Sequence, residues 1–300
     1  MQQHTKIGWV GLGVMGEPLC QHLLTAGYPV SVFTRSSDKS SAVLANSAQW
    51  CDSPAEVAKK SDVIFTMVGV GQEVEDVYFS KKGLFDCDIS DKVFIDMGTT
   101  APSLSVRISR YAQQHSAQSI DAPVSGGDVG ARNASLSIMA GGDEASIKSV
   151  SALFECLGHV QIMGAAGSGQ HAKICNQMVV AGTMIGVCEA LLYAKRAGLN
   201  CETMVAAIRQ GAAGCWTLDN LAPRIIKQDF SPGFMVDHII KDLAIAMQET
   251  ALMGLDLPGL SLAKSLYEKV HDLGHGKSGT QALLIALENT RSKHSSRGVS

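Results

Sequence analysis

The chain lacks the features that mark membrane proteins and nucleic-acid-binding proteins. No uninterrupted apolar run reaches the ~18 residues that a membrane-spanning helix requires. Lys and Arg number 25 against 28 Asp and Glu, so a net charge of −3 offers no basic surface to nucleic acid or to an anionic membrane. The first residues also lack the charged and apolar regions of a secretory leader. We therefore expect a cytoplasmic globular protein that binds neither nucleic acid nor membranes.

The cysteines and histidines lack the spacing of a metal site. The eight cysteines are scattered and form no C-x-x-C pair, which predicts reduced thiols with structural roles. Of the nine histidines, only His271 and His275 stand at the i, i+4 spacing of one helical face. They straddle Gly274 and lack the glutamate of an H-E-x-x-H motif. We expect no bound metal.

What the first half does contain is an alternation of strands and helices. With 300 residues, 46% of them hydrophobic, the chain is long enough for two domains. Helical stretches begin at Pro54 and after Pro102, and a further amphipathic one covers residues 143–156. The alternation predicts an α/β, Rossmann-type, doubly wound parallel sheet over residues 1–165. Its expected strands are residues 7–10, 30–33, 63–68, 93–97, 119–122, 136–140 and 160–163.

The pattern changes after the glycine-rich residues 164–169. About thirty residues without proline follow, up to Gly198, and predict one long helix that joins the two domains. Residues 201–210, 220–227, 236–253 and 260–273 also have helical periodicity, so we assign residues 166–300 to an all-α domain. A long helix that is apolar on most sides needs cover from neighbouring helices or a second subunit, and we expect at least a homodimer. The polar residues 291–300 are expected to form a frayed tail.

The N-terminal sequence predicts a dinucleotide site. In GLGVMG, Gly11, Gly13 and Gly16 have G-x-G-x-x-G spacing directly after an apolar run. Gly11 permits a tight turn, Gly13 lets a pyrophosphate approach the backbone, and Gly16 lets the next helix pack close to the strand. Amides at the helix N-terminus supply donors for the phosphates. An ordinary glycine-rich turn is the alternative, since 30 residues are glycine, but the strand–loop–helix–strand order over residues 7–33 favours the dinucleotide.

The end of the second expected strand indicates which dinucleotide binds. Sites for NAD place an Asp or Glu there to accept from the ribose 2′-hydroxyl. Here the sequence continues with Thr34, Arg35 and Ser36 and contains no acid. Because Arg35 can pair with a 2′-phosphate, helped by two neighbouring hydroxyls, the sequence favours NADP over NAD.

The long helix carries a polar stripe near its start. Lys173, Asn176 and Gln177 stand at i, i+3 and i+4, so they project from one face, while their neighbours are mostly apolar. A solvated face is one interpretation. In the other, burial removes water from Lys173, its pKa falls toward neutrality, and it exchanges a proton with a substrate hydroxyl.

Three further candidates each have a plain alternative. Ser125, with the amides of Gly126 and Gly127, follows an expected strand and can hold a carboxylate, or the segment is a rigid glycine turn after Pro123. Lys241 and Asp242, taken alone, are better interpreted as a surface ion pair. Trp216 either walls a pocket or fills the helical core.

Together the motifs resemble those of the β-hydroxyacid dehydrogenases, a family that includes 3-hydroxyisobutyrate dehydrogenases, tartronate semialdehyde reductases and glyoxylate or succinic semialdehyde reductases. The resemblance covers residues 5–290 and rests on four motifs in the family's order. They are GLGVMG at 11–16, DAPVSGG at 121–127, GSGQHAKICNQ at 167–177 and KDL at 241–243. It implies an NAD(P)-dependent enzyme that interconverts a small hydroxy acid and its semialdehyde or oxo acid by hydride transfer. From the apolar long helix, we expect this enzyme to be a homodimer or homotetramer.

The resemblance also implies roles on the substrate side. Lys173 corresponds to the general acid or base, and the Ser125 loop binds the substrate carboxylate. Asn176 matches an asparagine three residues after the lysine, whereas Gln177 stands where many relatives have a second asparagine. Trp216 matches a tryptophan of 3-hydroxyisobutyrate dehydrogenases. The substrate contacts implied are Ser125, Gly126, Gly127, Asn176, Gln177 and Trp216.

On the cofactor side, the resemblance implies that Thr99 lies near the nicotinamide and that Lys241 reaches the cofactor. Gly69 replaces a frequent proline and Ala134 a frequent turn glycine, so the loops at 68–72 and 128–135 are expected to differ from the family. The expected cofactor contacts are Gly11, Leu12, Gly13, Val14, Met15, Gly16, Thr34, Arg35, Ser36, Met67, Val68, Thr99 and Lys241.

Three rival interpretations of the same architecture are less favoured. Imine reductases commonly have another residue at the position of Lys173. A non-catalytic dinucleotide-binding module used for oligomerisation would have no need of Lys173, Asn176 and Ser125 together. The 6-phosphogluconate dehydrogenases have a longer helical part. The sequence alone does not identify the hydroxy acid or semialdehyde.

Overall fold

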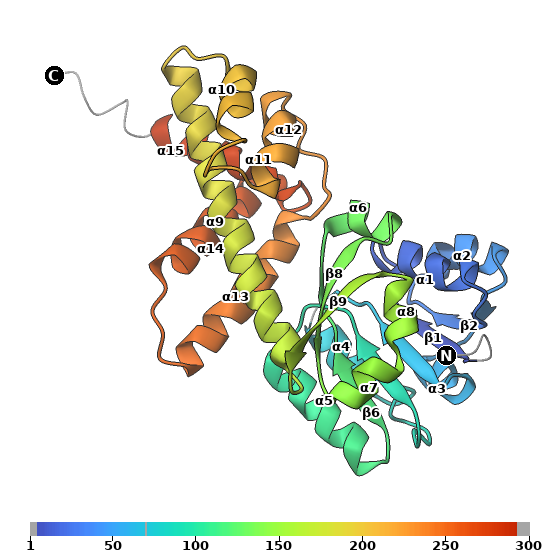
Figure 1. The fold of residues 1–300 in the computed structure, drawn as a ribbon. Helices are drawn as coiled ribbons and strands as arrows, with labels where there is room; N and C mark the ends of the chain where they lie inside the picture. The colour runs from blue at the N-terminus through green and yellow to red at the C-terminus, as the bar shows by residue number, and fades with distance from the viewer. Residues whose placement is uncertain (1–4, 70, 293–300) are drawn as a thin grey trace. The chain divides into compact units, whose positions relative to one another are not determined.

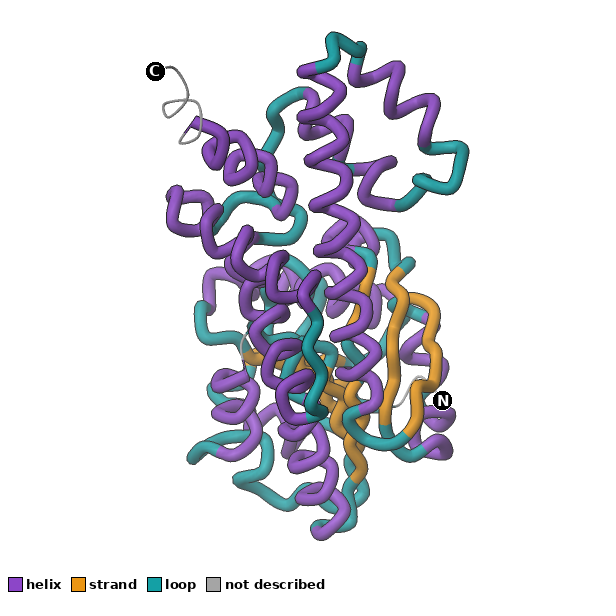
Figure 2. The backbone as a smooth tube through the Cα atoms, turned by 90° about the vertical axis from the view of Figure 1, so that its left-hand side faces the viewer, coloured by secondary structure: helices purple, strands orange, loops and turns teal. Residues whose placement is uncertain are grey.

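The computed structural model describes residues 5–69 and 71–292, which fall into two compact units, Met1–Lys173 and Ile174–Ser300 (Figure 1). All named strands belong to the first unit (Figure 2). Its strands are β1 Ile7–Val10, β2 Val30–Phe33, β3 Gln49–Trp50, β4 Val63–Thr66, β5 Val93–Asp96, β6 Gln118–Asp121, β7 Val124–Ser125, β8 Leu136–Gly141 and β9 Gly158–Gly164. Its helices are α1 Gly16–Thr25, α2 Ser41–Ala45, α3 Pro54–Lys60, α4 Gly71–Phe79, α5 Pro102–Gln114, α6 Gly127–Arg132, α7 Glu144–Ser149 and α8 Ser151–Glu155.

The strands form one sheet in the order β3-β2-β1-β4-β5-β6-β8-β7, and β9 pairs with β8. Strands β1 to β6 pair in parallel, whereas β8 is antiparallel to both β6 and β7. The strand order reverses at β1, which lies between β2 and β4. In an open α/β sheet, ligands bind outside the carboxyl ends of the strands at such a reversal. The predicted doubly wound, mostly parallel sheet is confirmed.

Alternate side chains of the central strands pack into two separate cores. Trp9 and Phe65 point to one face, where they stack with ring centroids 5.3 Å apart and meet the apolar sides of α1, α2, α7 and α8. Ile64 and Phe94 point to the other face, against α3, α4 and α5. Because both faces are covered by helices, these strands consist of continuous apolar runs.

The helix α9, Ser168–Arg196, begins in the first unit and continues into the second. The second unit otherwise contains α10 Cys201–Ile208, α11 Trp216–Asn220, α12 Ala222–Ile226, α13 Val236–Leu252, α14 Pro258–Val270 and α15 Leu283–Ser292. Their apolar faces surround one buried side of α9 that includes Ala181, Met184 and Cys188. By length and composition alone α9 could also cross a membrane, a weak criterion that core helices of soluble proteins pass as well. The predicted long joining helix and helical second domain are confirmed.

Some elements differ from the sequence prediction. The amphipathic stretch 143–156 is not one helix, because α7 and α8 are separated at Val150, whose φ/ψ of −107°/11° interrupts the helix. The stretch 220–227 is likewise not one helix, because Asn220 ends the short helix α11 and α12 covers only Ala222–Ile226. Of the predicted frayed tail at 291–300, residues 293–300 lie outside the described residues.

Candidate functional site

The glycine loop between β1 and α1 has no room for larger side chains at two of its three glycines. Gly11 has a φ of +99°, and a Cβ there would lie 2.4 Å from the Met67 carbonyl oxygen. A Cβ on Gly16 would lie 2.1 Å from the Gly11 carbonyl oxygen, which itself accepts a hydrogen bond from the Trp9 indole over 2.9 Å. Gly13, in contrast, faces open space. The loop therefore combines a tight turn, close helix–strand packing and an accessible backbone, and this combination fits a bound pyrophosphate.

Backbone hydrogen bonds that extend the sheet bring the other expected cofactor loops beside this one. Gly11 N donates to Phe33 O, Met67 N to Val10 O, and Met97 N to Thr66 O, each over 2.9 Å. The segments that begin after β1, β2, β4 and β5 therefore lie in a row at the carboxyl edge of the sheet. These segments carry Gly13, Thr34, Arg35, Ser36, Val68 and Thr99.

Arg35 has a partner that the local sequence did not indicate. Its exposed guanidinium donates to Oε1 of Glu73 in α4 over 2.6 Å, and Oε2 of Glu73 accepts from Gly69 N over 3.1 Å. The end of β2 itself contains no acid, as the sequence shows. The fold nevertheless brings one to Arg35 from 38 residues further along the chain.

The first turn of α9 lies directly on the end of β6. Oδ1 of Asp121 accepts from Gly167 N over 2.7 Å, and Oδ2 accepts from Gln170 N over 3.0 Å, so this carboxyl caps the helix. A Cβ on Gly169 would lie 2.3 Å from the Met139 carbonyl oxygen, and therefore only glycine permits this approach. Burial raises the pKa of Asp121 to about 7, and the two backbone hydrogen bonds oppose this shift.

Gln170 connects the same turn to the loop that carries Thr99. Its side chain is fully buried, donates from Nε2 to Gly98 O over 2.9 Å, and accepts at Oε1 from Thr100 N over 3.1 Å. Lys173 follows three residues later and is buried as well, with 7% of its surface exposed. The loop expected near the nicotinamide and the helix of the candidate acid or base are thus joined by one side chain.

The Ser125 loop is a short strand followed by a helix rather than an open turn. Val124 and Ser125 form β7, which pairs with β8, and α6 begins at Gly127. Gly126 and Gly127 have φ values of 130° and 63°, which glycine adopts readily. Ser125 is partly exposed, and no side chain caps the N-terminus of α6.

In the second unit, four polar side chains form one chain of contacts. Asn176 Nδ2 donates to Gln177 Oε1 over 2.7 Å, and Gln177 Nε2 donates to Asp242 Oδ2 over 2.6 Å. Lys241 Nζ lies 3.0 Å from Oδ1 of Asp242. Asp242 is only 3% exposed, so the interpretation of Lys241–Asp242 as a surface pair is wrong. It faces inward because it lies on the buried side of α13, at helical spacing from Ile239 and Ala246.

Trp216 does not fill the helical core. It starts α11 and is 61% exposed, which rules out one of its two interpretations, whereas Thr217 and Leu218 beside it are buried.

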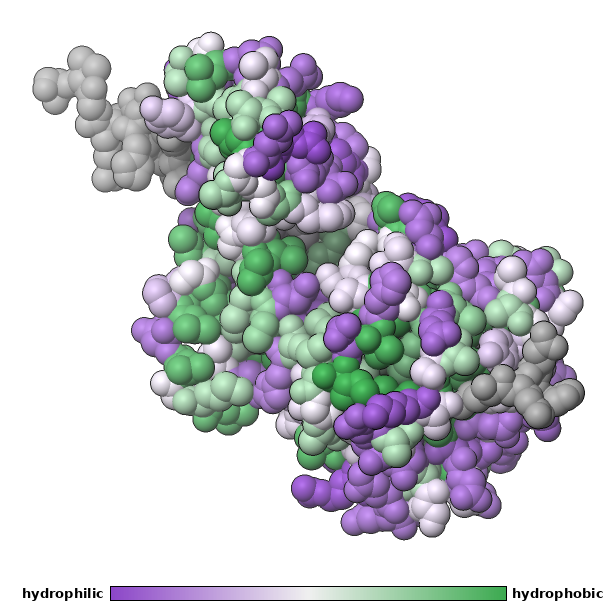
Figure 3. All heavy atoms as spheres, viewed as in Figure 1, coloured by the Kyte–Doolittle hydropathy of each residue, from purple (hydrophilic) through white to green (hydrophobic). Residues whose placement is uncertain are grey.

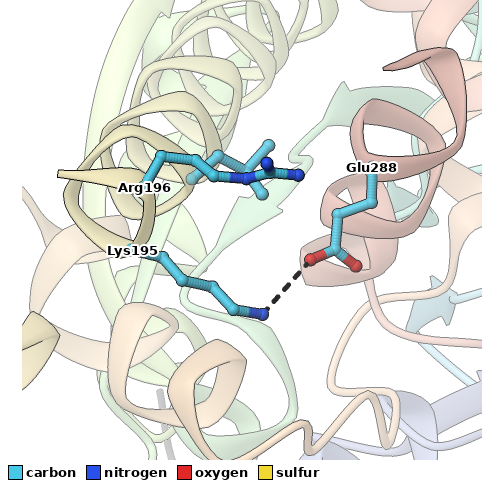
Figure 4. A pocket seen from close by; sticks show the side chains of 4 residues that line it. Lys195, Arg196 and Glu288 are labelled. Atoms are coloured by element: carbon cyan, nitrogen blue, oxygen red, sulfur yellow. Dashed lines mark ion pairs between the residues drawn. The ribbon is translucent and has the colours of Figure 1, made fainter. Parts of the chain in front are cut away.

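A pocket of about 420 Å³ opens elsewhere in the second unit, between the C-terminal end of α9 and α15. Lys195, Arg196 and Glu288 line it, with Lys195 Nζ 3.8 Å from Glu288 Oε1 (Figure 4). It contains none of the predicted site residues. Among the described residues, no group of three or more His, Cys, Asp or Glu is arranged to hold a metal ion.

Four residues that contact the candidate site were not predicted in these roles from the sequence: Glu73, Gln170, Asp242 as a buried group, and Asp121 as a helix cap. Their contacts join residues 38 to 72 positions apart. The motifs that contain Asp121, Gln170 and Asp242 were recognised, but local spacing does not indicate which side chains meet across the fold.

Comparisons with known proteins agree with the fold and the motifs. Residues 6–167 match the family model of the NAD binding domain of 6-phosphogluconate dehydrogenase. Residues 167–287 match that of the NAD-binding region of NADP-dependent 3-hydroxyisobutyrate dehydrogenase. The chain is 48% identical over 286 residues to the probable 3-hydroxyisobutyrate dehydrogenase-like 1 of Arabidopsis thaliana, covering 95% of this chain and 86% of that one.

Two further relatives support the same family assignment. The 2-hydroxy-3-oxopropionate reductase of Escherichia coli is 36% identical, with 94% of this chain and 97% of the relative covered. The solved structure of Mycobacterium tuberculosis 3-hydroxyisobutyrate dehydrogenase with L-serine superposes with a TM-score of 0.86 at 31% identity, covering 95% of this chain and 99% of that one. The chain therefore belongs to the β-hydroxyacid dehydrogenase family and is an NAD(P)-dependent oxidoreductase that acts on CH–OH groups.

Proposed function

We propose that this protein is an NADP-preferring enzyme that interconverts a small semialdehyde or oxo acid and the corresponding hydroxy acid, with Lys173 as the general acid or base. The observation that carries the proposal is the burial of Lys173 one helical turn after Gln170, whose side chain bonds the peptides on both sides of Thr99. Proton transfer and hydride transfer must occur at neighbouring atoms of one substrate, so their two sources must lie on parts of the protein that are held together.

Hydride transfer, proton transfer and carboxylate binding are assigned to different groups. The nicotinamide cofactor supplies or accepts the hydride when bound. In the reductive direction, the Lys173 ammonium group donates a proton from Nζ to the carbonyl oxygen, and in oxidation the neutral amine accepts the hydroxyl proton. Burial shields Nζ from bulk water, so the proton is exchanged with the substrate. The Ser125 hydroxyl and the amides of Gly126 and Gly127 bind the substrate carboxylate.

The second-unit contacts extend this assignment. Asn176 and Gln177 follow Lys173 on α9, and Gln177 is bonded to Asp242. We assign Asn176 to substrate binding. We assign two roles to the buried Gln177. It contacts the substrate, and through its hydrogen bond to Asp242 it also holds the Asp242–Lys241 pair in place.

The preference for NADP rests on Thr34, Arg35 and Ser36. Arg35 would pair with a 2′-phosphate in place of Glu73, and the loss of the exposed Arg35–Glu73 ion pair costs about 0–1 kcal/mol. A phosphate carries more charge than a carboxylate and accepts more hydrogen bonds, so the exchange favours the phosphorylated cofactor.

A second copy of the chain covers the exposed side of α9. This side carries Val179, Gly182, Gly186 and Tyr193, which recur at helical spacing and are all exposed. Further apolar surface lies over α13 and α14 (Figure 3), where the exposed side chains include Leu252, Met253, Leu255 and Leu262. Such an extended apolar area is typical of a homodimer or homotetramer. Gel filtration that shows a monomer at micromolar concentration would contradict it.

A substrate panel tests the proposed function. Glyoxylate, succinic semialdehyde and tartronate semialdehyde are assayed with NADPH and with NADH at matched concentrations. The hydroxy acid 3-hydroxyisobutyrate is assayed with NADP⁺ and with NAD⁺. We expect turnover of at least one semialdehyde or oxo acid with a higher kcat/KM for NADPH than for NADH. Absence of turnover across the panel contradicts the proposed substrate class, and equal values or a preference for NADH contradicts the NADP assignment.

A further inference from the structure

Gln170 makes two side-chain hydrogen bonds of opposite direction to the same loop. Nε2 donates to the Gly98 carbonyl oxygen, and Oε1 accepts from the Thr100 amide, so one partner only accepts and the other only donates. Only a side-chain amide presents a donor and an acceptor in this arrangement at all pH values. Because the two partners flank Thr99, the backbone on both sides of that residue is fixed to α9.

The turn that carries Gln170 is itself fixed to the sheet. Asp121 binds the amides of Gly167 and Gln170, and the space beside Gly169 is filled by the Met139 and Asp121 carbonyl oxygens. A Cβ at Gly169 would lie 2.3 Å and 2.6 Å from these two oxygens. The helix therefore cannot slide along the sheet without losing both cap bonds.

The Thr99 loop is held from its other side as well. Asp96 Oδ1 accepts from Gly98 N over 3.2 Å and from the Thr66 hydroxyl over 2.7 Å. Asp96 and Asp121 are register partners at the ends of β5 and β6, so the loop and the helix start from adjacent points of one sheet. Gln170 closes this arrangement, and Lys173 lies at i+3 from it on the same helical face.

We propose that Gln170 is a positioning residue that fixes the distance between the Thr99 backbone and Lys173. The inference rests on the proposed function, in which the nicotinamide lies beside Thr99 and Lys173 exchanges the proton. A displacement of about 1 Å between reacting groups costs up to about 10²-fold in rate. Gln170 touches neither substrate nor cofactor in this account and acts through Thr99 and Lys173.

The main test is Gln170→Met, which keeps the side-chain length and removes both hydrogen bonds. We expect kcat and kcat/KM to fall together by about 10- to 100-fold, because positioning for the reaction is lost while ground-state binding is kept. The deuterium isotope effect with 4-deuterated NADPH should rise as hydride transfer becomes rate-limiting. In the protein without cofactor, the Thr100 amide should exchange with D₂O faster than in the wild type.

The matched control is Gln281→Met in the second unit. Gln281 is also buried and also makes two side-chain hydrogen bonds to the backbone, to Asp229 O over 3.0 Å and to Ser231 O over 3.1 Å. Its replacement should lower the unfolding midpoint by a similar amount but leave kcat and the exchange of Thr100 unchanged. If Gln170→Met lowers only the midpoint and keeps kcat, Gln170 is merely structural and the inference is wrong.

A second variant keeps the inference testable if Gln170→Met does not fold. In Gln170→Glu, only the protonated carboxyl can both donate to Gly98 and accept from Thr100, so the ratio of variant to wild-type kcat should rise as the pH falls from 8 to about 5. Asp96, Asp121 and Lys173, the titratable groups around Gln170, are the same in both proteins, so the ratio isolates the introduced carboxyl. A ratio that does not change with pH overturns the inference.

The failure of the proposed function is recognised separately. If Lys173→Ala retains turnover in the same assay, the proposed function is wrong, whatever the result for Gln170→Met. If Lys173→Ala is inactive and Gln170→Met is not impaired, the function stands and the positioning role falls.

Discussion

The guanidinium of Arg35 at the end of β2 donates to the carboxylate of Glu73 in α4 over 2.6 Å. In the proposed function, a 2′-phosphate must compete with Glu73 for this arginine. We predict that Glu73→Gln lowers the Kd for NADPH about two- to fivefold, the scale of an exposed ion pair, and leaves the Kd for NADH unchanged.

Fluorescence titration of the reduced cofactors measures both constants. The effect should shrink at high salt, because exposed charges are screened. Glu75→Gln is the matched control, since Glu75 lies on the same helix and pairs with Arg107 over 2.7 Å instead. Equal changes for NADH and NADPH would show that Glu73 does not influence the choice between them.

The Gln177–Asp242 contact leads to a prediction about stability. In Gln177→Glu, a second carboxyl faces Oδ2 of the buried Asp242, from which Gln177 lies 2.6 Å away. Like charges at such a separation repel strongly when buried. The unfolding midpoint at pH 8 should therefore fall well below that of the wild type and recover as the pH is lowered to 5, where one carboxyl binds a proton.

Gln248→Glu serves as the control, since Gln248 is exposed on the same helix as Asp242. It should leave the midpoint nearly unchanged at both pH values. A Gln177→Glu midpoint that matches this control at pH 8 would mean that the Gln177–Asp242 bond does not form.

The raised pKa of Asp121 predicts that the stability of the folded protein depends on pH. Burial raises this pKa from an ordinary 3.8 to about 7 in the folded protein. Between these values the folded state keeps the proton and the unfolded state loses it, so this group lowers the stability as the pH rises from 4 to 7. The cost is fully present above about pH 7.

Asp121→Asn should remove this dependence, so the difference between variant and wild type in urea midpoint should change between pH 5 and pH 8. The variant also loses one cap bond, which costs about 1–3 kcal/mol at either pH. Asp143→Asn is the control, because Asp143 caps α7 and hydrogen bonds from Ser146 lower its pKa, which keeps it ionised throughout this range. A constant difference between Asp121→Asn and wild type would contradict the prediction.

The variant Gly182→Ala tests the proposal that a second copy of the chain packs on the exposed side of α9. Gly182 lies inside the helix, and a Cβ there would meet nothing within 4 Å in one chain. On a free helix surface, Gly182→Ala should stabilise by roughly 1 kcal/mol. If a second copy packs on this face, the added methyl group crowds the interface, and we predict weaker self-association by sedimentation. A more stable protein with unchanged association would show that this face is uncovered.

Much of the fold followed from local patterns. Apolar runs of four to six residues, helix starts at Pro54 and Pro102, and the spacing of Gly11, Gly13 and Gly16 depend on neighbours in sequence. The structure has strands, helices and a glycine loop at these places. Lys173 was selected as a candidate in the same way, through polar residues at helical spacing on an otherwise apolar helix, and its role stays a prediction.

The connections within the site did not follow from such patterns. Gln170 meets Gly98 from 72 residues away, Gln177 meets Asp242 from 65, and Arg35 meets Glu73 from 38. Asp242 was misassigned because an adjacent Lys–Asp pair is usually exposed, whereas the periodicity of α13 turns this aspartate inward. Long-range packing decides these partners, and single-sequence periodicity contains no information about it.

The central claim, that Lys173 exchanges the proton, is tested most directly by kcat of Lys173→Ala with the best semialdehyde of the panel. The account predicts a decrease of about 10²–10⁴-fold, the usual contribution of a general acid or base, with the Kd for NADPH nearly unchanged. Lys195→Ala, which removes an exposed lysine from the same helix, should turn over normally. A Lys173→Ala enzyme with near-wild-type kcat would contradict the account.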